Sequence, residues 1–481
     1  MRHLKELEQA ASPLEPDATQ RRYLVEQVMA YVEDYLAGQA GAPVYTDDAA
    51  NSRAIYDSPI TEDGVDIVEL LALLRENVDS IGLNTKSGRH LGYIPGGGLY
   101  HSALGDYLAA ALNRYAGLFF ACPGGVRVEN MLLRWMADMV GYPDTAAGNL
   151  SSGGSLANLT AIVAARDAAG IGGDTAGRAV IYVTEHVHHC IDKALHITGL
   201  DRAVRHTIPV DSGYRMKPGA LAAAIEADQK ADLQPWLVIG SAGTTNTGSV
   251  DPLAEIGQIA AGHGLWYHID GAYGAFFALC PEAKTVLQGM EQSDSIVLDP
   301  HKTLFLPYGS GALLVKDRQK LYNAFSADAA YLTTALEGGE ELSSAELSPE
   351  LTRHFRGLRL WLPLKLAGVA PFRAALSEKI QLARYFYEQI QTIDGFEVGP
   401  YPDLSIVIYR YVPPRGDPDA FNRRLMQLVQ QEGRIFISPT RVDGHFVLRA
   451  AIVSYNTHLA EVAEALEVLG RTANRLVSEG N

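Results

Sequence analysis

The stretches LWYHIDGAYGA (residues 265–275) and SIVLDPHKTLFL (residues 295–306) decide the fold. Each begins with a short apolar run, as a buried strand does, and then turns polar, at Asp270 in the first and at His301 and Lys302 in the second. In open parallel sheets, ligands bind beyond the carboxyl ends of the strands. The two stretches therefore predict buried strands whose ends carry a functional site.

The same pattern extends from about residue 150 to residue 316. Further apolar runs of strand length occur there, namely AVIYVTE (179–185), PWLVIGSAG (235–243) and GALLVK (311–316). Helical stretches such as PLAEIGQIAA (252–261) lie between several of these runs. This alternation predicts an α/β domain with a largely parallel sheet.

The two flanking regions have different patterns. Residues 1–85 contain amphipathic stretches, such as YLVEQVMAYVEDYL (23–36), whose apolar stripes need a partner surface on the main domain or on a second subunit. Residues 373–481 alternate helical and strand-like stretches, such as RIFIS (434–438), and fit a small α+β domain. We therefore expect three parts: an N-terminal helical segment (1–85), a large domain (86–372) and a small C-terminal domain (373–481).

The composition is that of a globular protein, with 47% hydrophobic and 20% charged residues. The net charge of −16 argues against nucleic acid or an anionic membrane as a partner. No apolar run approaches the ~18 residues of a membrane-spanning helix, and the first residues lack the apolar core of a secretory signal. Three cysteines without a CxxC pair favour a reducing compartment. We expect a cytoplasmic protein.

Asp270 and Lys302 together suggest a pyridine cofactor. Taken alone, Asp270 is more often a helix cap or part of a buried salt bridge, and Lys302 a surface charge. At the ends of two successive strands, however, they could hold the two ends of pyridoxal phosphate. The lysine would form a Schiff base with the cofactor aldehyde, and the carboxylate would keep the ring nitrogen protonated.

Three other segments fit such a site, and each also has a plain structural interpretation. LSSGGSLANL (150–159) places a Gly–Gly–Ser turn before a helix, where free N–H groups favour a phosphate, although any tight turn could use these residues. AGTTNTGSVDP (242–252) offers hydroxyl groups or forms an ordinary strand-to-helix turn. His188 could stack on a cofactor ring or simply begin a helix. The HxHH spacing of TEHVHHC (184–190) matches no common zinc site, so we expect no metal.

Read together, SSGGSLAN, HVHHCIDKA, AGTTNTG, HIDGAYGA and DPHKTLFLPYGSGALLVK resemble the pyridoxal-phosphate-dependent decarboxylases of the aromatic-L-amino-acid and glutamate decarboxylase family. The resemblance covers roughly residues 85–460. It implies the fold type I architecture, with a mostly parallel seven-stranded sheet in the large domain. It also implies a homodimer with active sites at the interface, in which residues 1–85 pack on the partner subunit.

The resemblance also assigns roles to individual residues. It implies that Lys302 binds the cofactor aldehyde and that Asp270 faces the ring nitrogen. The remaining implied contacts are His188 and Ala272 on opposite faces of the ring, Thr245 near its 3-hydroxyl group, Gly154, Ser155 and Asp299 around the phosphate, His301 facing the substrate, and Tyr331 as the proton donor to the substrate carbon. Arg449 matches a family arginine in the small domain, and a structural ion pair is an equally good interpretation of it. Family members often carry Asn where this chain has Asp299, so a carboxylate lies near the expected phosphate.

The implied reaction is α-decarboxylation of an L-amino acid, and the substrate is inferred from the expected pocket lining. Tyr93 and Phe119 favour an aromatic amino acid, whereas Arg127 leaves glutamate or aspartate as an alternative. The segment HLGYIPGGGLYH (90–101) is also expected to line this pocket and to make it roomy. A tyrosine at position 331 favours amine formation, and an aldehyde synthase or an aminotransferase is the rival reaction.

Overall fold

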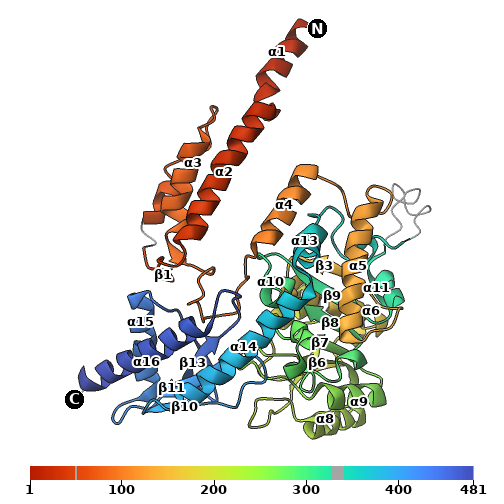
Figure 1. Cartoon of the computed structure of the whole chain (residues 1–481). Helices are drawn as coiled ribbons and strands as arrows, with labels where there is room; N and C mark the ends of the chain where they lie inside the picture. The colour runs from red at the N-terminus through yellow and green to blue at the C-terminus, as the bar shows by residue number, and fades with distance from the viewer. Residues whose placement is uncertain (49–50, 327–340, 480–481) are drawn as a thin grey trace.

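The computed structural model describes residues 1–48, 51–326 and 341–479. A seven-stranded sheet flanked by helices forms the large part of the molecule, and a second, smaller sheet lies near the C-terminus (Figure 1). The first helices project away from both (Figure 1). The predicted α/β architecture with a small C-terminal α+β part is confirmed.

The large sheet has the strand order β3-β9-β8-β7-β6-β4-β5. β9 runs antiparallel to both of its neighbours, and the other pairs are parallel, so the sheet is mostly parallel as expected. The strands are β3 (Ala147–Ser151), β4 (Ala179–Val183), β5 (Val204–Thr207), β6 (Gln234–Ser241), β7 (Trp266–Asp270), β8 (Ser295–Leu298) and β9 (Gly311–Val315). Apolar runs in the sequence located five of them, and the two that were missed, β3 and β5, are the edge strands.

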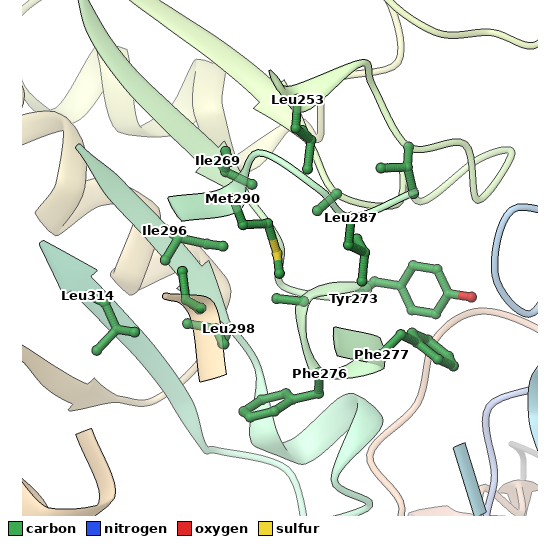
Figure 2. Close-up of a cluster of buried hydrophobic side chains, with 14 of the residues drawn as sticks. Leu253, Ile269, Tyr273, Phe276, Phe277, Leu287, Met290, Ile296, Leu298 and Leu314 are labelled. Atoms are coloured by element: carbon green, nitrogen blue, oxygen red, sulfur yellow. The ribbon is translucent and has the colours of Figure 1, made fainter. Parts of the chain in front are cut away.

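Helices cover both faces of this sheet. The helices on one face are α5 (Pro123–Val140), α8 (Pro218–Lys230) and α9 (Leu253–His263), and those on the other are α6 (Gly154–Ala168), α7 (Cys190–Ile197) and α11 (Arg318–Phe325). Figure 2 shows part of the core on the first face, where Leu253 of α9 lies near Ile269, and Ile296 and Leu298 of the next strand belong to the same cluster. Because these strand residues point into this core, the residues that alternate with them point toward the opposite face of the sheet.

Side chains alternate along β7, and this alternation directs its polar residues to the α6 face. Tyr267 and Ile269 belong to the core beneath α9. Trp266, His268 and Asp270 therefore point toward α6, since successive strand residues face opposite sides. Two polar residues thus lie on a buried face whose carboxyl end opens into the site.

The small C-terminal part is an antiparallel sheet with helices packed against it. Its strand order is β10-β11-β13-β12, and its elements are β10 (Phe396–Val398), β11 (Ile406–Tyr411), β12 (Ser438–Val442), β13 (His445–Ala451), α14 (Val369–Ile390), α15 (Pro418–Glu432) and α16 (Leu459–Glu479). The expected strand at 434–438 is wrong in position, because β12 begins only at Ser438. The expected domain start at residue 373 falls inside α14, which runs on from the large part.

The N-terminal helices bury almost nothing in a single chain. No residue of α1 (Arg2–Ala11), α2 (Ala18–Gly38) or α3 (Ile67–Leu74) is buried. Several of their apolar side chains, among them Leu24, Val25 and Val28, are exposed. Within the described ranges, no helix is long and apolar enough to cross a membrane.

Candidate active site

A cavity of about 340 Å³ opens beyond the carboxyl ends of β6, β7 and β8. It brings together nine residues that the sequence assigned to one site. These are Gly154, Ser155, His188, Thr245, Asp270, Ala272, Asp299, His301 and Lys302.

Lys302 is held by a buried carboxylate. It lies in the short helix α10 (Pro300–Thr303), and its Nζ is 3.0 Å from Oδ2 of Asp299, which is 1% exposed. Burial by itself lowers the pKa of Lys302, but Asp299 and Asp270 outweigh it and raise this pKa above its ordinary value. In this state the lysine is a charged ammonium paired with Asp299.

The segment that carries Lys302 is clamped by backbone contacts. The N–H of Gly97 donates to the carbonyl oxygens of His301 (3.2 Å) and Leu306 (3.0 Å). A Cβ at Gly97 would lie 2.5 Å from Cα of Phe305. Glycine at position 97 thus serves close backbone packing beneath α10, which is a different reason from the roomy pocket that the sequence suggested.

His301 lines the cavity and is fixed by a hydrogen bond through one of its ring nitrogens. Its Nδ1 donates to the carbonyl oxygen of Ser310 at 2.6 Å, so Nδ1 carries the hydrogen. Burial lowers the pKa of His301, which favours the neutral ring. Nε2, 3.8 Å from Oδ2 of Asp299, can therefore accept a proton.

His188 has the opposite tautomer. The backbone N–H of Cys190 donates to Nδ1 of His188 at 3.2 Å, so the hydrogen of the neutral ring lies on Nε2. Burial lowers the pKa of His188 as well. An uncharged, half-buried imidazole is suited to lie against a flat ring.

The turn before α6 has the geometry of an anion site. Gly153 has φ = +154°, a conformation that side chains disfavour, and it precedes the first turn of the helix. The N–H groups of Gly154 and Ser155, the first two residues of the helix, have no acceptor within it and meet the positive end of its dipole, whereas that of Leu156 donates to the carbonyl oxygen of Gly153 at 3.1 Å. A Cβ at Gly154 would lie 2.8 Å from Oδ2 of Asp299. Only glycine therefore leaves room for this carboxylate beside the turn.

Asp270 faces the cavity from the end of β7. Its Oδ1 accepts from the N–H of Ala272 at 3.1 Å, and its Oδ2 lies 3.4 Å from Nδ2 of Asn158 on α6. The N–H groups of Ala272 and Asn158 thus hold the carboxylate in the cavity, where its charge acts on Lys302.

Arg449 supports the Thr245 turn. Its guanidinium donates to the carbonyl oxygen of Thr245 at 2.6 Å and to Oγ of Ser438 at 3.2 Å. Burial lowers the pKa of Arg449 to about 10. No carboxylate pairs with it among the described residues, so a structural ion pair, one of the two interpretations of this arginine, is not found there.

The three expected substrate contacts lie outside the cavity lining of this chain. The N–H of Tyr93 donates to Oγ of Ser438 at 3.1 Å, which links it to Arg449. Arg127 forms an ion pair with Glu341 at 2.7 Å and lies over the ring of Phe119, 5.1 Å from its centroid. Tyr331 lies outside the described residues.

The cavity also contains residues that the sequence did not single out. They are Ser152, Leu156, Asn158, His186, Cys190, Ser241, Gly243, Thr244 and Tyr273. Nε2 of His186 is buried without a hydrogen-bond partner among the described residues. Burial, followed by the nearby Asp270, raises the pKa of Cys190 to about 12. Asn158 could have been found, because it lies four residues after Gly154 on the same helix face.

The chain is similar to known proteins of one family. The family model described as the pyridoxal-dependent decarboxylase conserved domain matches residues 52–412. The chain is 32% identical over 461 residues to the aromatic-L-amino-acid decarboxylase of Bacillus atrophaeus, covering 94% of this chain and 95% of that protein. It is 29% identical over 399 residues to the phenylacetaldehyde synthase of Arabidopsis thaliana, covering 80% of this chain and 81% of that protein.

A solved structure shares the fold over nearly the whole chain. The crystal structure of Oryza sativa TDC with PLP and tryptamine superposes with a TM-score of 0.91 at 27% identity, covering 96% of this chain and 99% of that one.

The cavity residues fit pyridoxal phosphate. An anion site at the start of α6 lies in the same cavity as a lysine and a carboxylate held by two donors. Lys302, Asp270 and the turn at Gly154 and Ser155 would hold the aldehyde, the ring nitrogen and the phosphate. The negative charge of Asp299 beside this turn opposes a phosphate, and its Oδ1 is buried without a partner among the described residues.

We expect Asp299→Asn to let pyridoxal phosphate attach to Lys302 at lower pH. Attachment requires the neutral amine, and Asp299 raises the pKa of Lys302. When the carboxylate is removed, burial remains and this pKa falls. Below the wild-type pKa, the rate of attachment should rise roughly tenfold for each pH unit by which the pKa falls. The visible absorbance of the attached cofactor, followed in apoprotein from neutral to alkaline pH, measures this rate.

The control variant is Asp201→Asn, which removes an exposed carboxylate paired with His196. Pyridoxal without its phosphate separates the effect on Lys302 from any effect on phosphate binding. If wild type and Asp299→Asn gave the same pH profile with pyridoxal, Asp299 would not control the protonation of Lys302.

Proposed function

Because the chain belongs to the family of pyridoxal-dependent decarboxylases, we propose that it converts an aromatic L-amino acid into the corresponding amine and carbon dioxide. The observation that carries this proposal is the placement of Lys302 and Asp270 in one cavity with an anion site at the start of α6. Relatives that act on aromatic amino acids, such as the Bacillus atrophaeus enzyme, support the substrate class.

Bound pyridoxal phosphate supplies an electron sink for the pair of electrons that the departing carboxylate leaves behind. In this proposal Lys302 anchors the cofactor and later releases the product amine. Asp270 keeps the ring nitrogen protonated, and the neutral ring of His188 lies flat against one face. All three side chains are only partly exposed, which limits the access of water to the α-carbon.

Two residues would handle the proton that replaces the carboxylate. The phenol of Tyr331 donates it to the α-carbon, as the family resemblance implies. His301 can take part because its Nε2 is free to accept and return a proton, while its Nδ1 is fixed by the carbonyl oxygen of Ser310.

The choice of an aromatic substrate is supported by the state of Arg127. Its guanidinium is engaged by Glu341 and by the ring of Phe119, so it is less suited to bind the side-chain carboxylate of glutamate or aspartate. The backbone N–H of Tyr93 is tied through Ser438 and Arg449 to the Thr245 turn, and this link supports a place for Tyr93 in the substrate pocket.

We also propose a cytoplasmic homodimer. The exposed apolar side chains of α2 and α3 need a covering surface, and a second copy of the chain would provide it. All three cysteines are free and buried, which suits a reducing compartment.

A panel of L-amino acids with added pyridoxal phosphate tests the reaction. We expect aromatic substrates to yield carbon dioxide and an amine, identified by mass, and Lys302→Ala to abolish turnover because it removes the anchoring amine. Lys193→Ala, which removes an exposed lysine on α7, is the control and should retain activity. Release of a ketoacid, or activity on glutamate alone, would contradict the proposal.

Replacing Tyr331 by phenylalanine should separate amine formation from aldehyde formation. Loss of the phenol removes the proton donor, so amine formation should fall roughly a hundredfold, and aldehyde output with consumption of oxygen should rise. Product masses and oxygen uptake measure both. Tyr322→Phe, in α11, is the matched control. Unchanged amine formation in Tyr331→Phe would remove Tyr331 from the mechanism.

Val28→Glu should weaken the dimer. A charge placed on the exposed apolar face of α2 would have to be buried against the partner, at a cost that lowers the association constant at least roughly tenfold. Light scattering across a dilution series measures the shift toward monomer. Ala227→Glu adds the same charge at an exposed position of α8 and should leave the mass unchanged. Equal masses for the two variants would contradict the proposed interface.

A further inference from the structure

A chain of buried polar side chains runs beneath the cavity and ends at Asp270. Nε1 of Trp266 lies 2.9 Å from Oγ of Ser295, and this oxygen lies 2.8 Å from Nδ1 of His268. Nε2 of His268 lies 2.7 Å from Oδ1 of Asn158, whose Nδ2 is 3.4 Å from Oδ2 of Asp270. The chain thus links the far end of β7 to the carboxylate in the cavity.

The strand pattern places these groups together. Trp266, His268 and Asp270 share the α6 face of β7, and Ser295 is the residue of β8 that pairs with His268 in the parallel register. Asn158 reaches them from α6. Ser295, His268 and Asn158 are each at most 1% exposed, so protein groups must satisfy their hydrogen bonds.

The far end of the chain is compatible with donation toward Asp270. The indole N–H of Trp266 can only donate, so Ser295 accepts there and has its own hydrogen available for Nδ1 of His268. Burial lowers the pKa of His268 to about 4, so its ring is neutral and carries one hydrogen. With Nδ1 accepting, that hydrogen lies on Nε2.

The near end of the chain fixes this direction. Nδ2 of Asn158 lies 2.9 Å from the carbonyl oxygen of Gly154, which can only accept. The NH₂ group of Asn158 must therefore be on that side, and Oδ1 faces His268, which has to donate. The flipped amide would put Oδ1 against both the Gly154 carbonyl and Asp270.

We propose that Trp266, Ser295, His268 and Asn158 are positioning residues that act through Asp270, as a one-way chain of donors ending on its carboxylate. The chain orients the carboxylate and supports its negative charge, and so keeps the ring nitrogen of the bound cofactor protonated. This role rests on the proposed function of Asp270, whereas the hydrogen positions within the chain do not.

The hydrogen positions can be measured without turnover. In full-length protein with ¹⁵N-labelled histidine, His268 should give the spectrum of a neutral ring protonated at Nε2, identified by its absence in His268→Gln. A ring protonated at Nδ1, or at both nitrogens, at neutral pH would overturn the proposal.

A pair of buried serines tests the function of the chain. Ser295→Ala breaks it and should weaken pyridoxal phosphate binding roughly three- to tenfold. It should also lower the protonated fraction of the ring nitrogen, read from ¹⁵N-labelled cofactor. Ser293→Ala removes an equally buried hydroxyl that pairs with Tyr142 instead, and both quantities should stay at the wild-type value. Equal behaviour of the two variants would overturn the proposal.

Two variants of His268 keep the proposal testable if the serine variants misfold, because they separate the loss of a hydrogen bond from a change in packing. His268→Gln retains an amide that can donate to Asn158, and His268→Leu does not. We expect the glutamine variant to recover most of the cofactor affinity that the leucine variant loses, and equal losses would mean that packing alone is responsible. If no amino acid were decarboxylated, the proposed function would fail. The histidine spectrum and the cofactor affinities would still test whether these hydrogen bonds position Asp270.

Discussion

The parallel pairing of β7 with β8 is the constraint on which the site depends. The register sets Asp270 opposite Val297, one residue before β8 ends. The chain then leaves β8 through Asp299 and enters α10, which carries Lys302. A slip of one residue would turn Asp270 into the core beneath α9 and separate it from the lysine. The core shown in Figure 2 opposes such a slip, because Ile269, Ile296 and Leu298 pack there together.

The charges of the site are arranged around one lysine. Two carboxylates, Asp270 and Asp299, act on a single buried ammonium. The positive end of the α6 dipole lies on the side where a phosphate would add negative charge. The site holds its two carboxylates differently, because Asp270 is supported by donors from Ala272 and Asn158, whereas Asp299 is supported by Lys302.

The central strands and the cavity residues were predictable because local sequence determines them. Strands buried on both faces must be apolar runs, and the polar residues that end them stand out. The edge strands β3 and β5 escaped notice because AGNLS and VRHT are not apolar runs, and β5 buries no residue. Asn158 and His186 were missed because their place in the site follows from tertiary packing. Arg127 was expected to contact substrate, and only the folded chain reveals its pairing with Glu341.

Cys190 lines the same cavity as Lys302, and its chemistry has to be compatible with a cofactor that carries an aldehyde. Thiols add to aldehydes as thiolates, and a thiol whose pKa is about 12 supplies almost none at neutral pH. Burial and the nearby carboxylate of Asp270 therefore keep the sulfur chemically silent. The residues proposed to hold the cofactor ring would thus also protect its reactive carbon from the one competing nucleophilic sulfur in the cavity lining of the described chain.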